Sequence, residues 1–221
     1  MEWKEQKKEF RIDGNLILCC MRGDDNHEQN IETVATAKRY LNKGVCALDL
    51  AGAEALFSTD KFEDIFKLAR QNNIPFTIHA GEAAGPESIK KALEYGATRI
   101  GHGVRCIEDT KLMQELRNKG ITLEVCPVSN IQTQAVAGQH PLEELYRNII
   151  STTISTDNNT VSNTDIEQEY LWVLENTDLQ LLDIVQMNIN ASRAIFDTPQ
   201  KKAKLVQEVY EQSKESGIKE I

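Results

Sequence analysis

The sequence lacks the features that mark membrane-spanning, secreted or nucleic-acid-binding proteins. No apolar run approaches the ~18 residues that a membrane span requires. The first ten residues, MEWKEQKKEF, are charged where a signal peptide would be apolar. The net charge of −9 disfavours nonspecific binding to nucleic acid or to anionic lipid, since both attract Lys and Arg. We therefore expect a soluble, cytoplasmic protein whose partner is a small molecule.

Cysteine is too scarce and too poorly spaced for a disulfide framework or a cysteine zinc site. The five cysteines are odd in number, and none belongs to a CxxC pair. Most of them lie in apolar runs, so we expect reduced, buried thiols. The chain also has no Gly/Ser linker and no low-complexity run that would mark a domain boundary. We predict one domain over residues 1–221.

Short runs rich in apolar and β-branched residues recur along the chain and predict six strands. These runs begin at Asn15, Val45, Phe76, Arg99, Ile121 and Ser151. Segments with helical spacing separate them, for example residues 62–73 and 88–96, and the tail from residue 163 is helical in pattern, with amphipathic segments at 165–177 and 201–216. A βα repeat of roughly 25 to 30 residues is typical of a parallel sheet.

Polar residues follow most of the predicted strands, where (β/α) barrels and open α/β sheets build their sites. A barrel is the better interpretation, but eight strands typically need ~250 residues. Either two strands are missing or the sheet is open. We predict an α/β fold of the (β/α) TIM-barrel type, incomplete, with about six of eight strands and a helical C-terminal tail.

Four residues at these strand ends are candidates for chemistry. His79 and Glu82 follow the third run, His102 the fourth and Asp157 the sixth. An imidazole can ligate zinc and a nearby carboxyl can transfer protons. Each residue also has a structural explanation: His79 can close a strand, Glu82 can begin a helix, and Asp157 can cap one. Because the ends of parallel strands converge, the combination indicates a site.

The remaining polar residues have ordinary explanations. His27 lies in a polar loop and His140 precedes Pro141 at a turn into a helix, so we assign neither a role. In the segment CPVSN, Pro127 can end a strand and Ser129 can cap a turn, which accounts for both without chemistry.

Five motifs then identify a resemblance. The segments DLAG from Asp49, HAGE from His79, RIGHGVR from Arg99, EVCPVSN from Glu124 and STDN from Ser155 occur in the order of the adenosine deaminase motif series. That family consists of zinc (β/α)-barrel enzymes of the amidohydrolase superfamily. The resemblance covers nearly the whole chain, including LILCCMR near its start.

The resemblance implies a role for each matching residue. His79 and Asp157 would be zinc ligands, with one Zn²⁺ in a complete active site. Glu82 would share its proton with N1 of the purine, and His102 would orient or deprotonate the zinc-bound hydroxide. The backbone N–H of Gly52 would contact N3. Asn158 stands where many members carry a second Asp, and its amide can donate to N7.

The sequence departs from the family at its N-terminal side. The family's first strand ends in an HxH pair of zinc ligands, and this sequence contains no HxH. The match starts at what would be the third strand, so the predicted domain is truncated on its N-terminal side. Open sheet edges recruit other chains, and we expect an oligomer or a complementing chain there. Three functions stay open: an adenosine deaminase, a non-catalytic purine-binding remnant, and a deaminase for adenine, AMP or a modified nucleoside.

Overall fold

The structure is a computed structural model that describes residues 13–218. The charged N-terminal stretch, in which we expect no signal peptide, lies outside these residues. Across residues 13–218, no helix is both long enough and apolar enough to cross a membrane.

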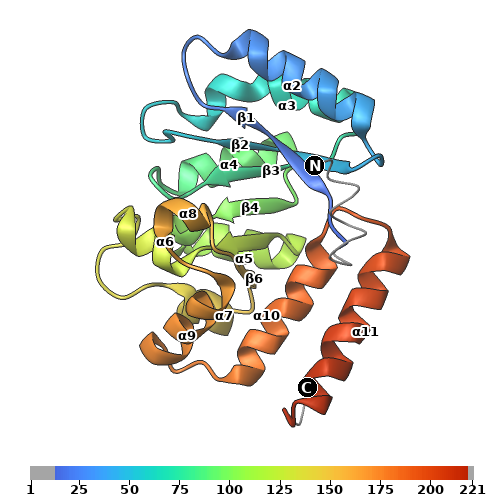
Figure 1. Ribbon diagram of the computed structural model, residues 1–221. Coiled ribbons are helices and arrows are strands. Elements are labelled where there is room, and N and C mark those ends of the chain that lie inside the picture. The colour runs from blue at the N-terminus through green and yellow to red at the C-terminus, as the bar shows by residue number, and fades with distance from the viewer. Residues whose placement is uncertain (1–12, 219–221) are drawn as a thin grey trace.

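Six parallel strands form the centre of the molecule, as predicted (Figure 1). Strands β1 and β2 make one sheet and β3 to β6 a second, in chain order, and a bridge between Leu48 and Phe76 connects the two. The strands are β1 (Leu16–Met21), β2 (Val45–Ala51), β3 (Thr77–Ala80), β4 (Arg99–His102), β5 (Thr122–Val125) and β6 (Ser151–Ile154).

Helices follow the strands and cover the outer face of the sheet (Figure 1). They are α2 (His27–Tyr40), α3 (Glu63–Gln71), α4 (Pro86–Tyr95), α5 (Thr110–Lys119), α6 (Pro127–Gln132), α7 (Leu142–Arg147), α8 (Asn159–Ser162), α9 (Ile166–Asn176), α10 (Leu181–Ala194) and α11 (Pro199–Glu215), with short 3₁₀ turns at Thr59–Phe62 and Val104–Glu108. The predicted tail is helical: α10 packs against β6 and against α11. This arrangement is the expected incomplete (β/α) barrel.

Strand register decides which side chains enter the barrel interior. Ile78, Ile100 and Leu123 align across β3, β4 and β5 and are fully buried. The neighbouring row aligns His79 with Gly101 and Glu124, and these residues line an interior cavity. Because side chains alternate along a strand, a shift of one residue would turn His79 out of the interior.

The expectation of buried thiols needs correction at the edge of the fold. The first strand is an apolar run, but Leu16 and Met21 of β1 are 44% and 47% exposed, because among residues 13–218 β1 pairs only with β2. For the same reason Cys19 is exposed, and Cys46 is half-buried. All five cysteines are free, and burial raises the pKa of Cys20 and Cys106 to about 12.

Each of the connections into β4, β5 and β6 contains a residue in the left-handed conformation. In two of them this residue is glycine, and in the third it is isoleucine. Gly96 follows α4, Gly120 follows α5 and Ile149 follows α7, with φ of 94°, 63° and 60°. Glycine adopts this conformation at little cost, whereas a β-branched residue is strained there. Ile149 is also 76% exposed, so its side chain gains little from packing.

Candidate functional site

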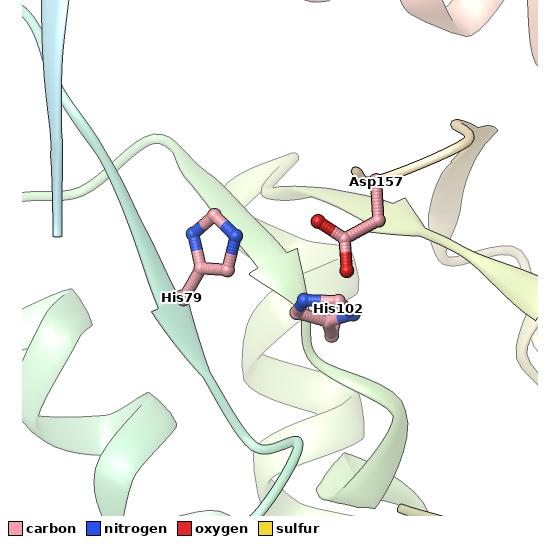
Figure 2. Close-up of side chains that lie close together, drawn as sticks. All are labelled: His79, His102 and Asp157. Carbon is pink, nitrogen blue, oxygen red and sulfur yellow. The ribbon is translucent and has the colours of Figure 1, made fainter. Parts of the chain in front are cut away.

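Three of the four predicted residues converge at the C-terminal ends of the strands. Figure 2 shows the side chains of His79 on β3, His102 at the end of β4 and Asp157 after β6 directed toward a common space. One potential ligand atom from each lies within 4.8 Å of the others. His79 and Asp157 are far apart in the sequence, because β4, β5 and β6 lie between them, and the parallel sheet brings their side chains together.

Close backbone approach makes this convergence possible. A Cβ on Gly101 would lie 2.8 Å from Nδ1 of His79, so only glycine fits beside that ring. His102 and Asp157 have φ of 60° and 56°, a conformation that costs non-glycine residues energy and tends to occur at functional sites. The GHG motif therefore serves close packing, as its glycines predict.

Asp49, a residue of the DLAG motif, positions His79. Its carboxylate oxygens lie 3.1 Å and 2.9 Å from Nδ1 of His79. Burial lowers the pKa of His79, but the nearby carboxylates, Asp49 foremost, outweigh burial and raise the pKa to about 9. A carboxylate at Nδ1 leaves Nε2 as the nitrogen that faces a metal, which is a common arrangement in zinc sites.

Glu82 lies beside His102 rather than beside His79. Oε2 of Glu82 is 3.4 Å from Nε2 of His102, and Oε1 accepts a hydrogen bond from the Thr133 hydroxyl at 2.9 Å. Burial lowers the pKa of His102, which is 1% exposed, more than the Glu82 carboxylate raises it. The two side chains are thus close enough to act on one bound molecule.

The donor atoms fit zinc. The imidazole of His79 and the carboxylate of Asp157 are zinc ligands of the usual kinds, and the imidazole of His102 lies beside them. Asp157 is further held by Ser129, whose hydroxyl donates to Oδ2 at 2.7 Å. The site therefore has suitable donors and a fixed carboxylate for a metal ion.

The two predicted substrate-binding residues follow strand ends, Gly52 directly after β2 and Asn158 next to Asp157 after β6. Gly52 follows β2, is exposed and has φ of 110°, a value that suits glycine. Asn158 is the N-cap of α8: its Oδ1 accepts from the N–H of Val161, and this bond does not involve the donor Nδ2. The helix cap considered for Asp157 is thus made by its neighbour.

Two buried residues that the sequence analysis missed hold the HAGE segment. The carboxylate of Glu54, 4% exposed, accepts hydrogen bonds from the backbone N–H groups of residues 81–84. Arg22, the last residue of LILCCMR, donates to the carbonyl oxygen of His79 at 2.6 Å. Ser88 bridges to Glu54 and Thr59, and Thr59 accepts from Arg22. A charged clamp therefore fixes the backbone between His79 and Ala84.

Two residues to which the sequence analysis assigned no role, Asn130 and His140, are connected to the site by hydrogen bonds. Asn130, in CPVSN, approaches both His102 and Glu82 with its amide nitrogen, at 2.9 Å and 3.4 Å. His140 precedes Pro141 at the start of α7, as predicted, and it is also buried and hydrogen-bonded to Asn130. Within the described part of the chain, His27 contacts the exposed Asp64 and does not line the cavity of the candidate site. No local pattern marks His140, because its partner lies on another element.

The cavity that contains this cluster has a volume of about 470 Å³. Ile17, Ile154 and Ile166 supply its apolar wall, and His79, His102 and Asp157 its polar wall. A larger cavity of about 920 Å³ lies at the opposite strand ends, beside Arg99, Thr122 and Ser151. We place the functional site in the smaller cavity because His79, His102 and Asp157, the potential metal ligands, all line it.

The chain is similar to known proteins over most of its length. The family model for adenosine deaminase matches residues 2–212. The adenosine deaminase of Haemophilus ducreyi is 50% identical over 187 residues, which are 82% of this chain and 54% of that protein. Among the curated relatives it matches, the chain spans only about half of each protein's length.

Solved structures show the same fold. The adenine deaminase of Arthrobacter aurescens superposes with a TM-score of 0.86 at 25% identity, covering 96% of this chain and 65% of that one. An amidohydrolase from Burkholderia ambifaria with bound zinc superposes with a TM-score of 0.87 at 17% identity, covering 98% and 62%. The second likeness concerns the fold alone.

Proposed function

Because the chain belongs to the adenosine deaminase family, we propose that it carries most of the catalytic face of a zinc-dependent enzyme that hydrolyses adenosine or deoxyadenosine. Water replaces the 6-amino group, which leaves as ammonia, and inosine or deoxyinosine forms. The observation that carries this proposal is the convergence of His79, His102 and Asp157, with Glu82 against His102, at one end of the sheet. Packing alone does not require these polar groups to meet.

Glu82 and His102 are the proposed catalytic residues. Glu82 donates a proton to N1 of the purine, and this makes C6 more electrophilic. The hydrogen bonds from Thr133 and Asn130 hold the carboxyl group of Glu82 in place. His102, at 3.4 Å from Glu82, contacts the attacking oxygen. General acid–base transfer of this kind contributes typically ~10² to 10⁴ in rate.

Gly52 and Asn158 are the proposed purine contacts. The backbone N–H of Gly52 donates to N3, and the absence of a side chain leaves the base room to approach. The amide nitrogen of Asn158 donates to N7, since the cap of α8 uses the other side-chain atom.

His79 and Asp157 would hold the zinc ion. Bound zinc lowers the pKa of water and so supplies a nucleophile at neutral pH. Asp49 orients His79 and Ser129 orients Asp157, so both ligands are already positioned by their hydrogen bonds.

A second polypeptide segment would complete the site. The sequence has no HxH pair, and β1 and β6 each pair on one side only among residues 13–218. Unpaired parallel strands with exposed apolar residues attract further strands. We therefore expect either self-association through these edges or complementation by a chain that carries the missing ligands. Sedimentation that finds a stable, folded monomer at all concentrations would rule out self-association.

The deciding experiment measures zinc stoichiometry and inosine production by the purified chain, with and without added zinc. Turnover that requires zinc and that is lost in Glu82→Ala supports the proposal. Zinc binding without turnover, in a chain that still binds purine, would instead support a non-catalytic purine-binding protein. The absent HxH pair is the observation that favours this second function.

A substrate panel tests the third possibility, a deaminase for another 6-aminopurine. Its support is the likeness to the Arthrobacter aurescens adenine deaminase. Comparing adenosine, adenine, AMP and an N6-modified nucleoside would identify the substrate by the highest kcat/KM.

A further inference from the structure

A chain of hydrogen bonds runs from the backbone of α7 to the proposed site. The N–H of Leu142 donates to Nδ1 of His140 at 3.1 Å. Nε2 of His140 lies 3.3 Å from Oδ1 of Asn130, and Nδ2 of Asn130 lies 2.9 Å from Nδ1 of His102. His140 is 4%, Asn130 0% and His102 1% exposed, so water does not compete with these bonds.

The first bond fixes the tautomer of His140. A backbone N–H can only donate, and therefore Nδ1 of His140 must accept and carries no proton. The single proton of the neutral ring is then on Nε2. Burial supports the neutral form, since it lowers the pKa of His140 to about 4.

The second bond fixes the orientation of Asn130. Because Nε2–H of His140 donates, Asn130 must present its carbonyl oxygen to that ring. The Asn130 amide nitrogen consequently faces His102 and Glu82. Exchanging the oxygen and nitrogen of Asn130 would place its NH₂ group against the Nε2–H of His140, and two donors cannot form a hydrogen bond. The donors and acceptors therefore determine the orientation of the Asn130 amide.

The third bond, from Asn130, determines the tautomer of His102. The amide of Asn130 donates to Nδ1 of His102, so that nitrogen is an acceptor without a proton. The proton of neutral His102 is then on Nε2, which lies 3.4 Å from the carboxylate of Glu82.

We propose that His140, acting through Asn130, holds His102 in the Nε2–H tautomer, so that His102 presents a hydrogen-bond donor to the cavity. Resting on the proposed function, this makes His102 a residue that orients the attacking oxygen by donation, and neither a metal ligand nor the base. His140 and Asn130 are positioning residues, and His79 and Asp157 remain the metal-binding pair.

The test is a long-range ¹H–¹⁵N spectrum of the imidazoles in the full chain at pH 8. The sequence has only four histidines, and single substitutions assign them. In the unmodified chain we expect His102 with its proton on Nε2. In Asn130→Asp, which has nearly the same shape but cannot donate, we expect Nδ1 of His102 to become protonated.

Two substitutions of His140 complete the test. His140→Leu removes the donor to Asn130, and we expect a mixture of His102 tautomers in place of one. His140→Gln keeps a donor, and we expect it to restore the single tautomer. His27→Gln is the matched control, because His27 contacts only exposed Asp64. Urea unfolding of each variant separates a local change from loss of the fold.

The outcomes are decisive without turnover or zinc. A proton on Nδ1 of His102 in the unmodified chain would overturn the proposal. So would a folded Asn130→Asp or His140→Leu variant whose His102 keeps the single Nε2–H tautomer. An inactive chain with the expected tautomers would count against the proposed function while leaving this inference in place.

Discussion

The buried carboxylate of Glu54 should control the rigidity of the segment that carries Glu82. Its Oε2 accepts the N–H groups of residues 82–84 at 2.8 to 3.1 Å, and its Oε1 accepts the N–H of Gly81 and the hydroxyl of Ser88. A negative charge facing four converging N–H groups is a favourable arrangement. Glu54→Gln removes the charge and replaces one acceptor by a donor.

The size of the effect follows from the number of bonds. A hydrogen bond to a charged group contributes about 1.5 to 3 kcal/mol, and a neutral one about 1. With the glutamine oxygen facing residues 82–84, the Gly81 bond is lost and three bonds lose their charge. We expect the free energy of local opening to fall by at least about 3 kcal/mol. That change corresponds to a roughly 100-fold faster amide exchange.

Hydrogen exchange measured by mass spectrometry provides the assay. The exchange of residues 81–84 should accelerate, while that of β5 and α10 should not. Glu169→Gln is a matched control, because Glu169 is also buried but accepts a single backbone N–H, that of Val128, among residues 13–218. A change below threefold at residues 81–84, or an equal change throughout the chain, would refute the reasoning.

Three further outcomes follow from individual residues. Ile149→Gly should relieve left-handed backbone strain and raise the free energy of unfolding by about 1 kcal/mol, or Tm by ~2–4 °C. Gly120→Ile, at a position in open space with φ of 63°, should lower Tm by a similar amount. Tm values equal to that of the unmodified chain would contradict this prediction. Gly101→Ala should displace the His79 ring and weaken zinc binding at least tenfold in titration calorimetry, at little cost to secondary structure; unchanged affinity would show that His79 is not a ligand. The pKa of His140 is about 4 in the folded state and about 6.5 in the unfolded state. The contribution of His140 to the free energy of unfolding is therefore fully present above pH 6.5, and about 3 kcal/mol of it is lost as the pH falls to 4. Urea unfolding of His140→Gln should show a smaller loss of stability between pH 6.5 and 4.

Much of the fold was predictable because its signals are local. Each of the six strands is a short apolar run, and α4 ends at Gly96 as its sequence predicts. The exposure of β1 was not predictable from its apolar residues, since exposure depends on whether another strand lies alongside. The apolar sequence of residues 16–21 is typical of a buried strand, but in the structure these residues form an edge strand of the sheet.

The site was predictable in part for a related reason. His79, His102 and Asp157 stand at strand ends, and a parallel sheet brings strand ends together. Their partners were not predictable. Glu54 lies just after β2 and His140 just before the short helix α7, and neither residue belongs to one of the five motifs.

The family, the order of strands and helices, and the polar residues at the strand ends can be predicted from the amino-acid sequence, because they depend on motif order and on spacing along the chain. Which side chains meet depends on the folded chain: Asp49 contacts His79, Glu54 contacts the HAGE backbone, and His140 contacts Asn130. Hydrogen bonds act over about 3 Å. Whether residues many positions apart come that close depends on sheet register and helix packing, and neither is encoded at any single position.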